Sequence, residues 1–335
     1  MTTEKSMPQA WQEAPLDPDR PIVDPHHHLG DKPGRPPYLL AEFLRDMGRG
    51  HNIVKTVCVE STSMYRADGP EDMRPVGETE FLNGIAAMSA SGLYGPTRVC
   101  AGIVGCVDFL LGDRVKPVLE AHIAAGNGRF RGIRNTVAFD DFPGLKNHRA
   151  RPPLVLCEPA FRKGFVHLAP LGLSFDTWLY FTQLLDVIDL AGAFPDTVIV
   201  VNHMGGPIGI GPYRERRAEA LAEWKKRLEE LSRRPNVYLK VGGLGMPTIG
   251  LGFDTWSGRP GSKDLEPVWR PYVETCLELF GPKRSMFESN YPPDGKSCDY
   301  GVLWNTLKRI SADCSEDEKD ALFRGTATRV YRLGN

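Results

Sequence analysis

Three consecutive histidines, His26 to His28, follow a short apolar segment in the stretch IVDPHHHLG at residues 22–30. The chain has eight histidines, so this stretch holds a large share of them. In an extended strand, residues i and i+2 face the same side, with Cα atoms about 6.5 Å apart. His26 and His28 can therefore point into one site and bind the same metal ion, whereas His27 points away. A solvated polar turn is the alternative.

Eight short β-branched apolar segments are spread along the chain, with helix-like segments between them. They lie at residues 21–24, 53–60, 98–105, 129–138, 172–178, 197–203, 236–242 and 284–290. Among the intervening segments, 178–193 has apolar residues near helical spacing, and 216–234 is amphipathic with a basic end typical of a helix C-terminus.

This alternation predicts a parallel sheet, and eight units predict a (β/α)8 TIM barrel. An open doubly wound sheet is the alternative, but no G-x-G-x-x-G motif follows the first strand. Barrel enzymes carry their active sites at the C-terminal ends of the strands, which is where the histidines stand. Three segments rich in proline and glycine, at 29–37, 66–77 and 245–261, are predicted to be long loops at that end.

Composition excludes several classes of protein. Basic and acidic residues nearly cancel, at 41 and 42, so nothing indicates nucleic acid or another polyanion as a partner. Seven scattered cysteines without a C-x-x-C motif indicate reduced thiols and a cytoplasmic protein. No apolar run is long enough for a membrane span or a signal peptide. Residues 1–19 are predicted to be a loose arm or a homo-oligomer contact, and residues 20–335 a single domain.

The segment VDPHHHL at 23–29 resembles the D-x-H-x-H first-strand motif of the amidohydrolase superfamily. Four further segments extend the resemblance along nearly the whole chain: RFRGIR (129–134), VIVVNHMGGP (198–207), RSMFESNYPPD (284–294) and SMYRADGPEDMRPVGETEF (63–81). They resemble the fourth-, sixth- and eighth-strand motifs and a stretch typical of a less studied subgroup. The resemblance is to the amidohydrolase-2 branch, lactonase-like TIM-barrel hydrolases related to 2-pyrone-4,6-dicarboxylate lactonase. It implies a metal-dependent-hydrolase-like barrel.

The resemblance also implies roles for particular residues. His26 and His28 would hold a metal ion or polarise a substrate carbonyl, and His203 matches the sixth-strand histidine of the same site. A divalent ion, zinc foremost, is the cofactor implied. Because the fifth strand has no histidine and offers only Asp176 or Trp178 in that neighbourhood, the ion would be weakly bound or absent.

Asn290 stands where typical members of the superfamily place an aspartate. An amide cannot take a proton from the attacking water, so the base must lie elsewhere. Asp294 is our first candidate for the base. The alternative is that Asp294 only initiates the P-D-G turn. Arg134 is predicted to polarise the carbonyl or bind an oxyanion, ahead of Arg131, with a structural salt bridge as the alternative.

Substrate contacts are predicted from the loops at the same rim. The candidates are Glu60, Tyr65, Arg66, Trp178 and Tyr291. Together they favour a small organic substrate with an apolar or aromatic part and an anionic group, although ordinary packing also accounts for isolated aromatic residues.

Three functions fit the sequence. The first is a hydrolase of a lactone, ester or amide, in which water attacks a polarised carbonyl. The second is a metal-dependent decarboxylase of an aromatic acid, and the third is a non-catalytic barrel that binds a small molecule. We favour the hydrolase, with a role in aromatic catabolism.

Overall fold

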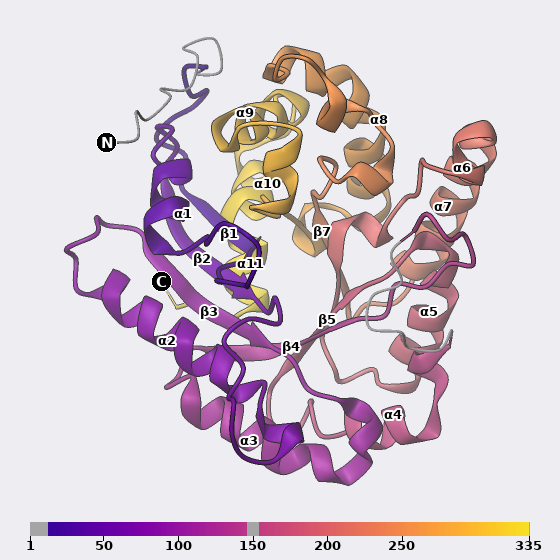
Figure 1. The fold of residues 1–335 in the computed structure, drawn as a ribbon. Coiled ribbons are helices and arrows are strands. Elements are labelled where there is room, and N and C mark those ends of the chain that lie inside the picture. Colours follow the sequence, from indigo (N-terminus) through magenta and orange to yellow (C-terminus); the bar gives the residue numbers. More distant parts are fainter. Residues whose placement is uncertain (1–12, 146–153, 335) are drawn as a thin grey trace.

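The computed structural model describes residues 13–145 and 154–334, and they fold into a (β/α)8 barrel as predicted (Figure 1). Eight strands form one parallel sheet in which each strand pairs with the next one in sequence. The strands are β1 (Ile22–His27), β2 (Ile53–Val59), β3 (Arg98–Gly105), β4 (Phe130–Thr136), β5 (Ser174–Trp178), β6 (Ile199–Val201), β7 (Val237–Val241) and β8 (Ser285–Phe287).

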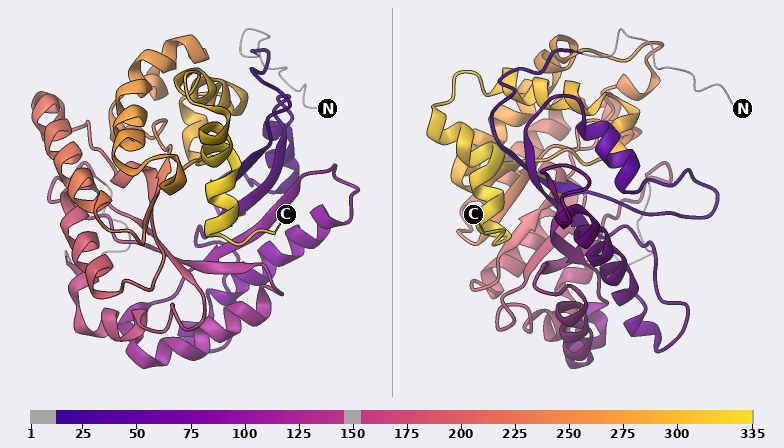
Figure 2. Two further views of the ribbon diagram at one scale, coloured as in Figure 1. Left: turned by 180° about the vertical axis from the view of Figure 1, so that it is seen from behind. Right: turned by 90° about the vertical axis from the view of Figure 1, so that its left-hand side faces the viewer.

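Helices surround this ring of strands, as the two views of Figure 2 show. Those in the described part of the chain are α1 (Leu40–Met47), α2 (Val76–Ala90), α3 (Val115–Ala125), α4 (Pro159–Phe165), α5 (Leu184–Ala193), α6 (Pro212–Glu215), α7 (Arg217–Ser232), α8 (Ser262–Phe280), α9 (Tyr300–Ile310), α10 (Glu316–Asp320) and α11 (Thr326–Val330). No helix within this part has the length and hydropathy needed to cross a bilayer.

The barrel closes between β1 and the segment that follows β8. The backbone N–H of Asn290 donates to the carbonyl oxygen of His26 at 2.9 Å, and that of His28 donates to Tyr291 at 2.8 Å. His27 and Tyr291 form a parallel bridge between these two hydrogen bonds. The histidine motif is therefore part of the closure, and its backbone is held from both sides.

Strand boundaries near the motif differ from the prediction. The first strand extends to His27 rather than ending at residue 24, so His26 and His27 belong to the strand and His28 follows it directly. Strands β6 and β8 end at Val201 and Phe287, several residues earlier than predicted. The predicted helix at 178–193 begins at Leu184, because Trp178 still pairs within the sheet.

Of the predicted arm at 1–19, residues 1–12 lie outside the described residues. The next residues lie against the C-terminal helices. Glu13 accepts a hydrogen bond from the backbone of Ser262 at 2.6 Å, and the backbone N–H of Leu16 donates to the Asn305 side chain at 2.7 Å. The division into an arm and a single domain remains a prediction.

Two histidines outside the motif, His51 and His122, are buried in the helical layer. Burial lowers the pKa of each to about 4, and the Lys308 ammonium adds to the effect at His51. As the pH falls below about 6.5, the unfolded chain therefore binds protons that the folded chain excludes. This costs stability of up to about 3 kcal/mol for each histidine between about pH 6.5 and 4.

His122→Gln removes one of these two contributions, so from pH 7 to pH 4 its urea midpoint of unfolding should fall less, or rise more, than that of the wild type. An identical pH profile for His122→Gln and the wild type would contradict the assignment.

Candidate active site

Three histidine side chains converge at the C-terminal ends of β1 and β6. The Nε2 atoms of His26 and His28 lie 3.2 Å apart, and the ring centroids of His26 and His203 lie 4.6 Å apart. His203 follows β6 in a positive-φ conformation, with φ of 52°. The structure thus brings together the three histidines that the sequence singled out.

In each ring, Nδ1 faces an acceptor. His28 Nδ1 lies 2.8 Å from the carbonyl oxygen of Val59, which can only accept, so Nδ1 carries the proton. His203 Nδ1 lies 2.6 Å from Glu288 Oε1, which also accepts the backbone N–H of His203 at 3.2 Å. His26 Nδ1 lies 2.9 Å from Glu288 Oε2. For His28 and His203, this arrangement leaves the Nε2 lone pair available, as in histidines that bind metals.

His26 has a second neighbour at the same nitrogen. Lys240 Nζ lies 3.3 Å from His26 Nδ1 and 2.8 Å from Asp176 Oδ2. An ammonium only donates, so Lys240 suits the other tautomer, in which His26 Nε2–H donates to His28. Glu288 Oε2 is close to His26 but is not aligned for a hydrogen bond, and it has no other partner in the described part of the chain. Glu288 therefore suits the tautomer of His26 with the proton on Nδ1, and Lys240 suits the tautomer with the proton on Nε2.

Burial keeps the three imidazoles neutral. It lowers the pKa of each well below the usual range, with Lys240 adding to the effect at His26 and Arg134 at His28 and His203. Neutral imidazole is the form that binds a metal ion. Burial also raises the pKa of Glu288 to about 8, against the opposing effect of Lys240.

A cavity of about 580 Å³ opens above the histidines, a size that suits a small organic ligand. Its lining includes His28, His203 and four cationic side chains: Lys32, Arg35, Arg134 and Lys296. Glu60 is the one carboxylate among the described lining residues, and it accepts a hydrogen bond from Arg134 Nε at 3.0 Å. The cavity is therefore suited to an anionic ligand.

A comparison with protein-family models identifies residues 23–333 with the model described as Amidohydrolase. The chain belongs to the amidohydrolase family. The match covers the whole barrel, so this amidohydrolase is an enzyme of the hydrolase type, as the sequence predicted.

Three proteins illustrate what this amidohydrolase is similar to. The uncharacterized protein y4mH of Sinorhizobium fredii is 34% identical, over 94% of this chain and 99% of the relative. L-fucono-1,5-lactonase of Burkholderia multivorans is 28% identical, over 52% of this chain and 56% of that enzyme. The crystal structure of a Burkholderia multivorans amidohydrolase with bound zinc has a TM-score of 0.70 and 23% identity, over 93% and 99% of the two chains. This last similarity shows the fold.

The predicted site residues of the amidohydrolase fall into three sets. Those that line the cavity are His28, Glu60, Arg134, Trp178, His203 and Asn290. His26 is fully buried beneath them. The other predicted residues do not line the cavity among the described residues: Tyr65, Arg66, Tyr291 and Asp294. Arg66 pairs with Glu80 on the surface, and the Tyr291 hydroxyl donates to the carbonyl oxygen of Cys298 at 2.5 Å.

Asp294, the candidate base, lies behind Asn290. Its Oδ1 accepts a hydrogen bond from Asn290 Nδ2 at 2.7 Å, and its Oδ2 accepts from the backbone of Gly245 at 3.0 Å. Burial raises its pKa to about 8, against the opposing effect of these two hydrogen bonds. These contacts position Asn290, and the carboxyl of Asp294 does not line the cavity among the described residues, so its role as a base stays a prediction.

Sequence reasoning missed two buried residues of the amidohydrolase site. Glu288 contacts His26 and His203, and Lys240 lies beside His26. A signal for Lys240 was a lone lysine within the apolar strand NVYLKVG. For Glu288, the signal was its position two residues after the apolar Met286. In an extended chain, residues at this spacing face the same side, so Glu288 is expected to be buried like Met286. The catalytic roles of all these residues stay predictions.

Proposed function

We propose that this amidohydrolase hydrolyses a small lactone or ester that carries an anionic group. One observation carries the proposal: three neutral histidines, of which His28 and His203 have Nδ1 hydrogen-bonded to an acceptor, meet at a cavity lined by cations. The similarity to L-fucono-1,5-lactonase supports lactone chemistry. The cationic lining favours a carboxylated lactone over a neutral sugar lactone.

The histidines also fit a divalent metal ion. Two nitrogens on one tetrahedral zinc ion, each bound at about 2.0–2.1 Å, lie about 3.3 Å apart, close to the 3.2 Å between His26 Nε2 and His28 Nε2. Glu288 Oε2 is a buried carboxyl oxygen without a hydrogen-bond partner among the described residues, and a bound cation beside it would favour the ionised form.

His26, His28 and His203 would hold the ion, and Glu288 would orient two of their rings. A bound divalent ion supplies a Lewis acid for the carbonyl and a water of lowered pKa.

The protein's own residues supply the remaining functions. Arg134, buried at the cavity floor, would bind the carboxylate of the substrate or the oxyanion that develops. Trp178 contacts His203 edge-on at 4.8 Å between ring centroids and gives the substrate ring an apolar wall. Lys32, Arg35 and Lys296 attract the anion at the rim. Glu60 is the lining carboxylate, and we propose that it accepts the proton of the attacking water.

Glu60→Gln tests this last assignment. We expect kcat to fall about 100-fold or more, because general-base catalysis contributes about 10²–10⁴-fold. The amide oxygen can still accept the hydrogen bond from Arg134, so KM should change little. Asp294→Asn is the comparison, because its carboxyl lies outside the cavity lining. A larger loss in Asp294→Asn than in Glu60→Gln would contradict the assignment.

The function itself is tested by incubating purified protein, with and without added zinc, with 2-pyrone-4,6-dicarboxylate, L-fucono-1,5-lactone and neutral aryl esters. Acid release during ring opening is followed with a pH indicator. We expect turnover of the carboxylated lactone. Turnover of neutral lactones alone would overturn the anionic substrate class. Release of carbon dioxide from carboxylated phenols, without lactone hydrolysis, would overturn the hydrolase in favour of the decarboxylase.

A further inference from the structure

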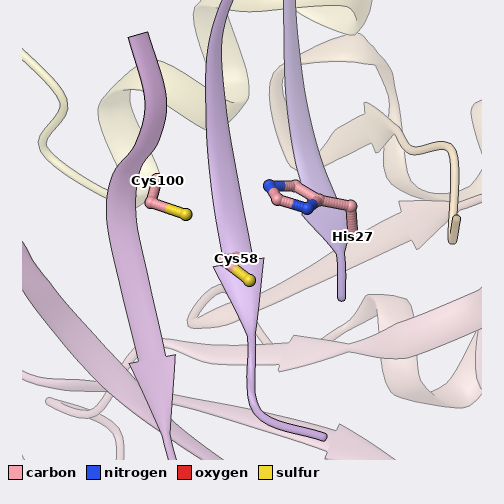
Figure 3. A group of neighbouring side chains, drawn as sticks. All are labelled: His27, Cys58 and Cys100. Carbon is pink, nitrogen blue, oxygen red and sulfur yellow. The ribbon is translucent and has the colours of Figure 1, made fainter. Parts of the chain in front are cut away.

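His27 faces away from the active-site histidines, toward two cysteines. Figure 3 shows the His27 ring of β1 turned toward Cys58 of β2 and Cys100 of β3. One ring nitrogen of His27 and the two sulfur atoms all lie within 4.8 Å of one another. All three side chains are fully buried. Two thiols and an imidazole thus meet across three adjacent strands, outside the cavity described above.

The imidazole of His27 has one nitrogen without a partner. Its Nε2 lies 2.8 Å from Thr56 Oγ1, which also accepts the backbone N–H of Cys100 at 3.0 Å. Its Nδ1 has no hydrogen-bond partner among residues 13–145 and 154–334. A buried polar atom in this condition costs about 1–3 kcal/mol unless something binds it. Phe43 stacks on the ring at 4.0 Å between centroids and holds it in place.

The backbone also presents Cys100 to the cluster. Cys100 has φ of 54°, a conformation that a cysteine rarely adopts, and the β2–β3 register shifts nearby, between Lys55 and Val57. Such irregularities re-aim a side chain relative to a regular strand, at a cost of about 1–3 kcal/mol. Here the result is a second sulfur within reach of Cys58, with which it is in hydrogen-bonding contact.

We propose that His27, Cys58 and Cys100 form a second metal site, which takes a thiophilic divalent ion such as zinc. Thiolate and imidazole are the ligands that zinc prefers, and a Cys₂His set with an oxygen in the fourth position is a known zinc environment. The Thr56 hydroxyl supplies an oxygen beside the cluster.

Charge also favours a divalent ion. Two thiolates neutralise it, so the complex adds no net charge to an apolar region. Both thiols lose their protons to solvent as the two metal–sulfur bonds form. Burial raises the pKa of Cys58, so the ion must displace this proton.

The site has a structural consequence for the active site. His27 is the last residue of β1 and lies between His26 and His28 in the sequence, so an ion bound there ties β1 to β2 and β3 behind the catalytic face. Binding of an ion to the folded state alone stabilises that state. The second site would therefore hold the first-strand histidines in position without touching the substrate.

Cobalt(II) distinguishes this site from the active site. The reduced, metal-free full chain is titrated with cobalt(II) without oxygen, and thiolate-to-cobalt charge-transfer absorption is recorded in the near ultraviolet. Because the active-site histidines offer no sulfur, this absorption reports cobalt bound to cysteine, and His27, Cys58 and Cys100 are the one sulfur-containing group of potential ligands within residues 13–145 and 154–334. We expect it to saturate at one equivalent of thiolate-bound cobalt per chain and to disappear when zinc is added.

Cys58→Ser and Cys100→Ser should each abolish the absorption, whereas Cys276→Ser, which replaces a buried cysteine outside the cluster, should keep it. Circular dichroism confirms that each variant folds. Absence of the band in the wild type overturns the proposal whether or not the variants fold, and so does a band that survives in the Cys58→Ser/Cys100→Ser double variant. The measurement requires no substrate, so its outcome is independent of the proposed hydrolase activity.

Discussion

His28→Ala is expected to lower kcat/KM on the verified substrate by about 10³-fold, equivalent to about 4 kcal/mol of lost transition-state stabilisation. The side chain lines the cavity, and its Nε2 lies 3.2 Å from that of His26. Removing it takes away one of the groups proposed to hold the divalent ion. Elemental analysis should therefore show a loss of metal that parallels the loss of turnover.

The fold should survive this substitution, because the His28 side chain is half-buried and, in the described part of the chain, its one hydrogen bond outside the histidine cluster is to the carbonyl oxygen of Val59. His167→Ala provides the matched control, since this histidine pairs with Asp113 near the surface. Wild-type kcat/KM in His28→Ala, with the melting temperature unchanged, would remove the catalytic role. A large fall in melting temperature would call for His28→Asn, which keeps a polar side chain.

The sequence predicted His26 and His28 well because the argument is local. Strand alternation places residues i and i+2 on one face whatever the rest of the chain does. The same alternation sends His27 to the opposite face, where it meets Cys58 and Cys100. The eight-strand barrel was predictable for a similar reason, since each strand and helix has its own periodicity.

Residues beyond the strand ends were harder to predict. His203 and Asn290 both have positive φ, at 52° and 50°, so strand alternation no longer describes where their side chains point. Their conformations depend on contacts made after the barrel closes, such as the hydrogen bond from Asn290 to the backbone of His26. The resemblance to the superfamily supplied His203, but it also directed attention to Asn290 and Asp294 rather than to Glu288.

Lys240 shows a further limit of sequence reasoning. A lysine in a central strand is predicted to be on the surface, because burying an unpaired ammonium is costly. Its burial is possible here because Asp176 of β5 accepts a hydrogen bond from the Lys240 ammonium. Tyr331, near the C-terminal end of the chain, donates a hydrogen bond to the same carboxylate. Asp176 is 64 residues from Lys240 along the chain, and Tyr331 is 155 residues from Asp176. No local sequence pattern can therefore predict these contacts.

Asp176→Ala is expected to lower the free energy of unfolding by about 3–5 kcal/mol, because it leaves a buried ammonium without its counter-ion. Asp176 Oδ2 accepts hydrogen bonds from Lys240 at 2.8 Å, Tyr331 at 2.8 Å and Asn202 at 3.0 Å. Neither Asp176 nor Lys240 is exposed to solvent. Urea unfolding followed by tryptophan fluorescence measures the change through the midpoint and the slope.

Two comparisons separate the charge effect from lost packing. Lys163 and Asp113 form an ion pair of the same 2.8 Å length on the surface, and Asp113→Ala should leave the midpoint unchanged because water replaces the partner. The double variant Asp176→Leu/Lys240→Met should recover most of the lost stability, since it removes both buried charges and keeps their volume. If the double variant were less stable than Asp176→Ala, the loss of stability would come from packing or from the hydrogen bonds of Tyr331 and Asn202. The unpaired charge of Lys240 would then not be its cause.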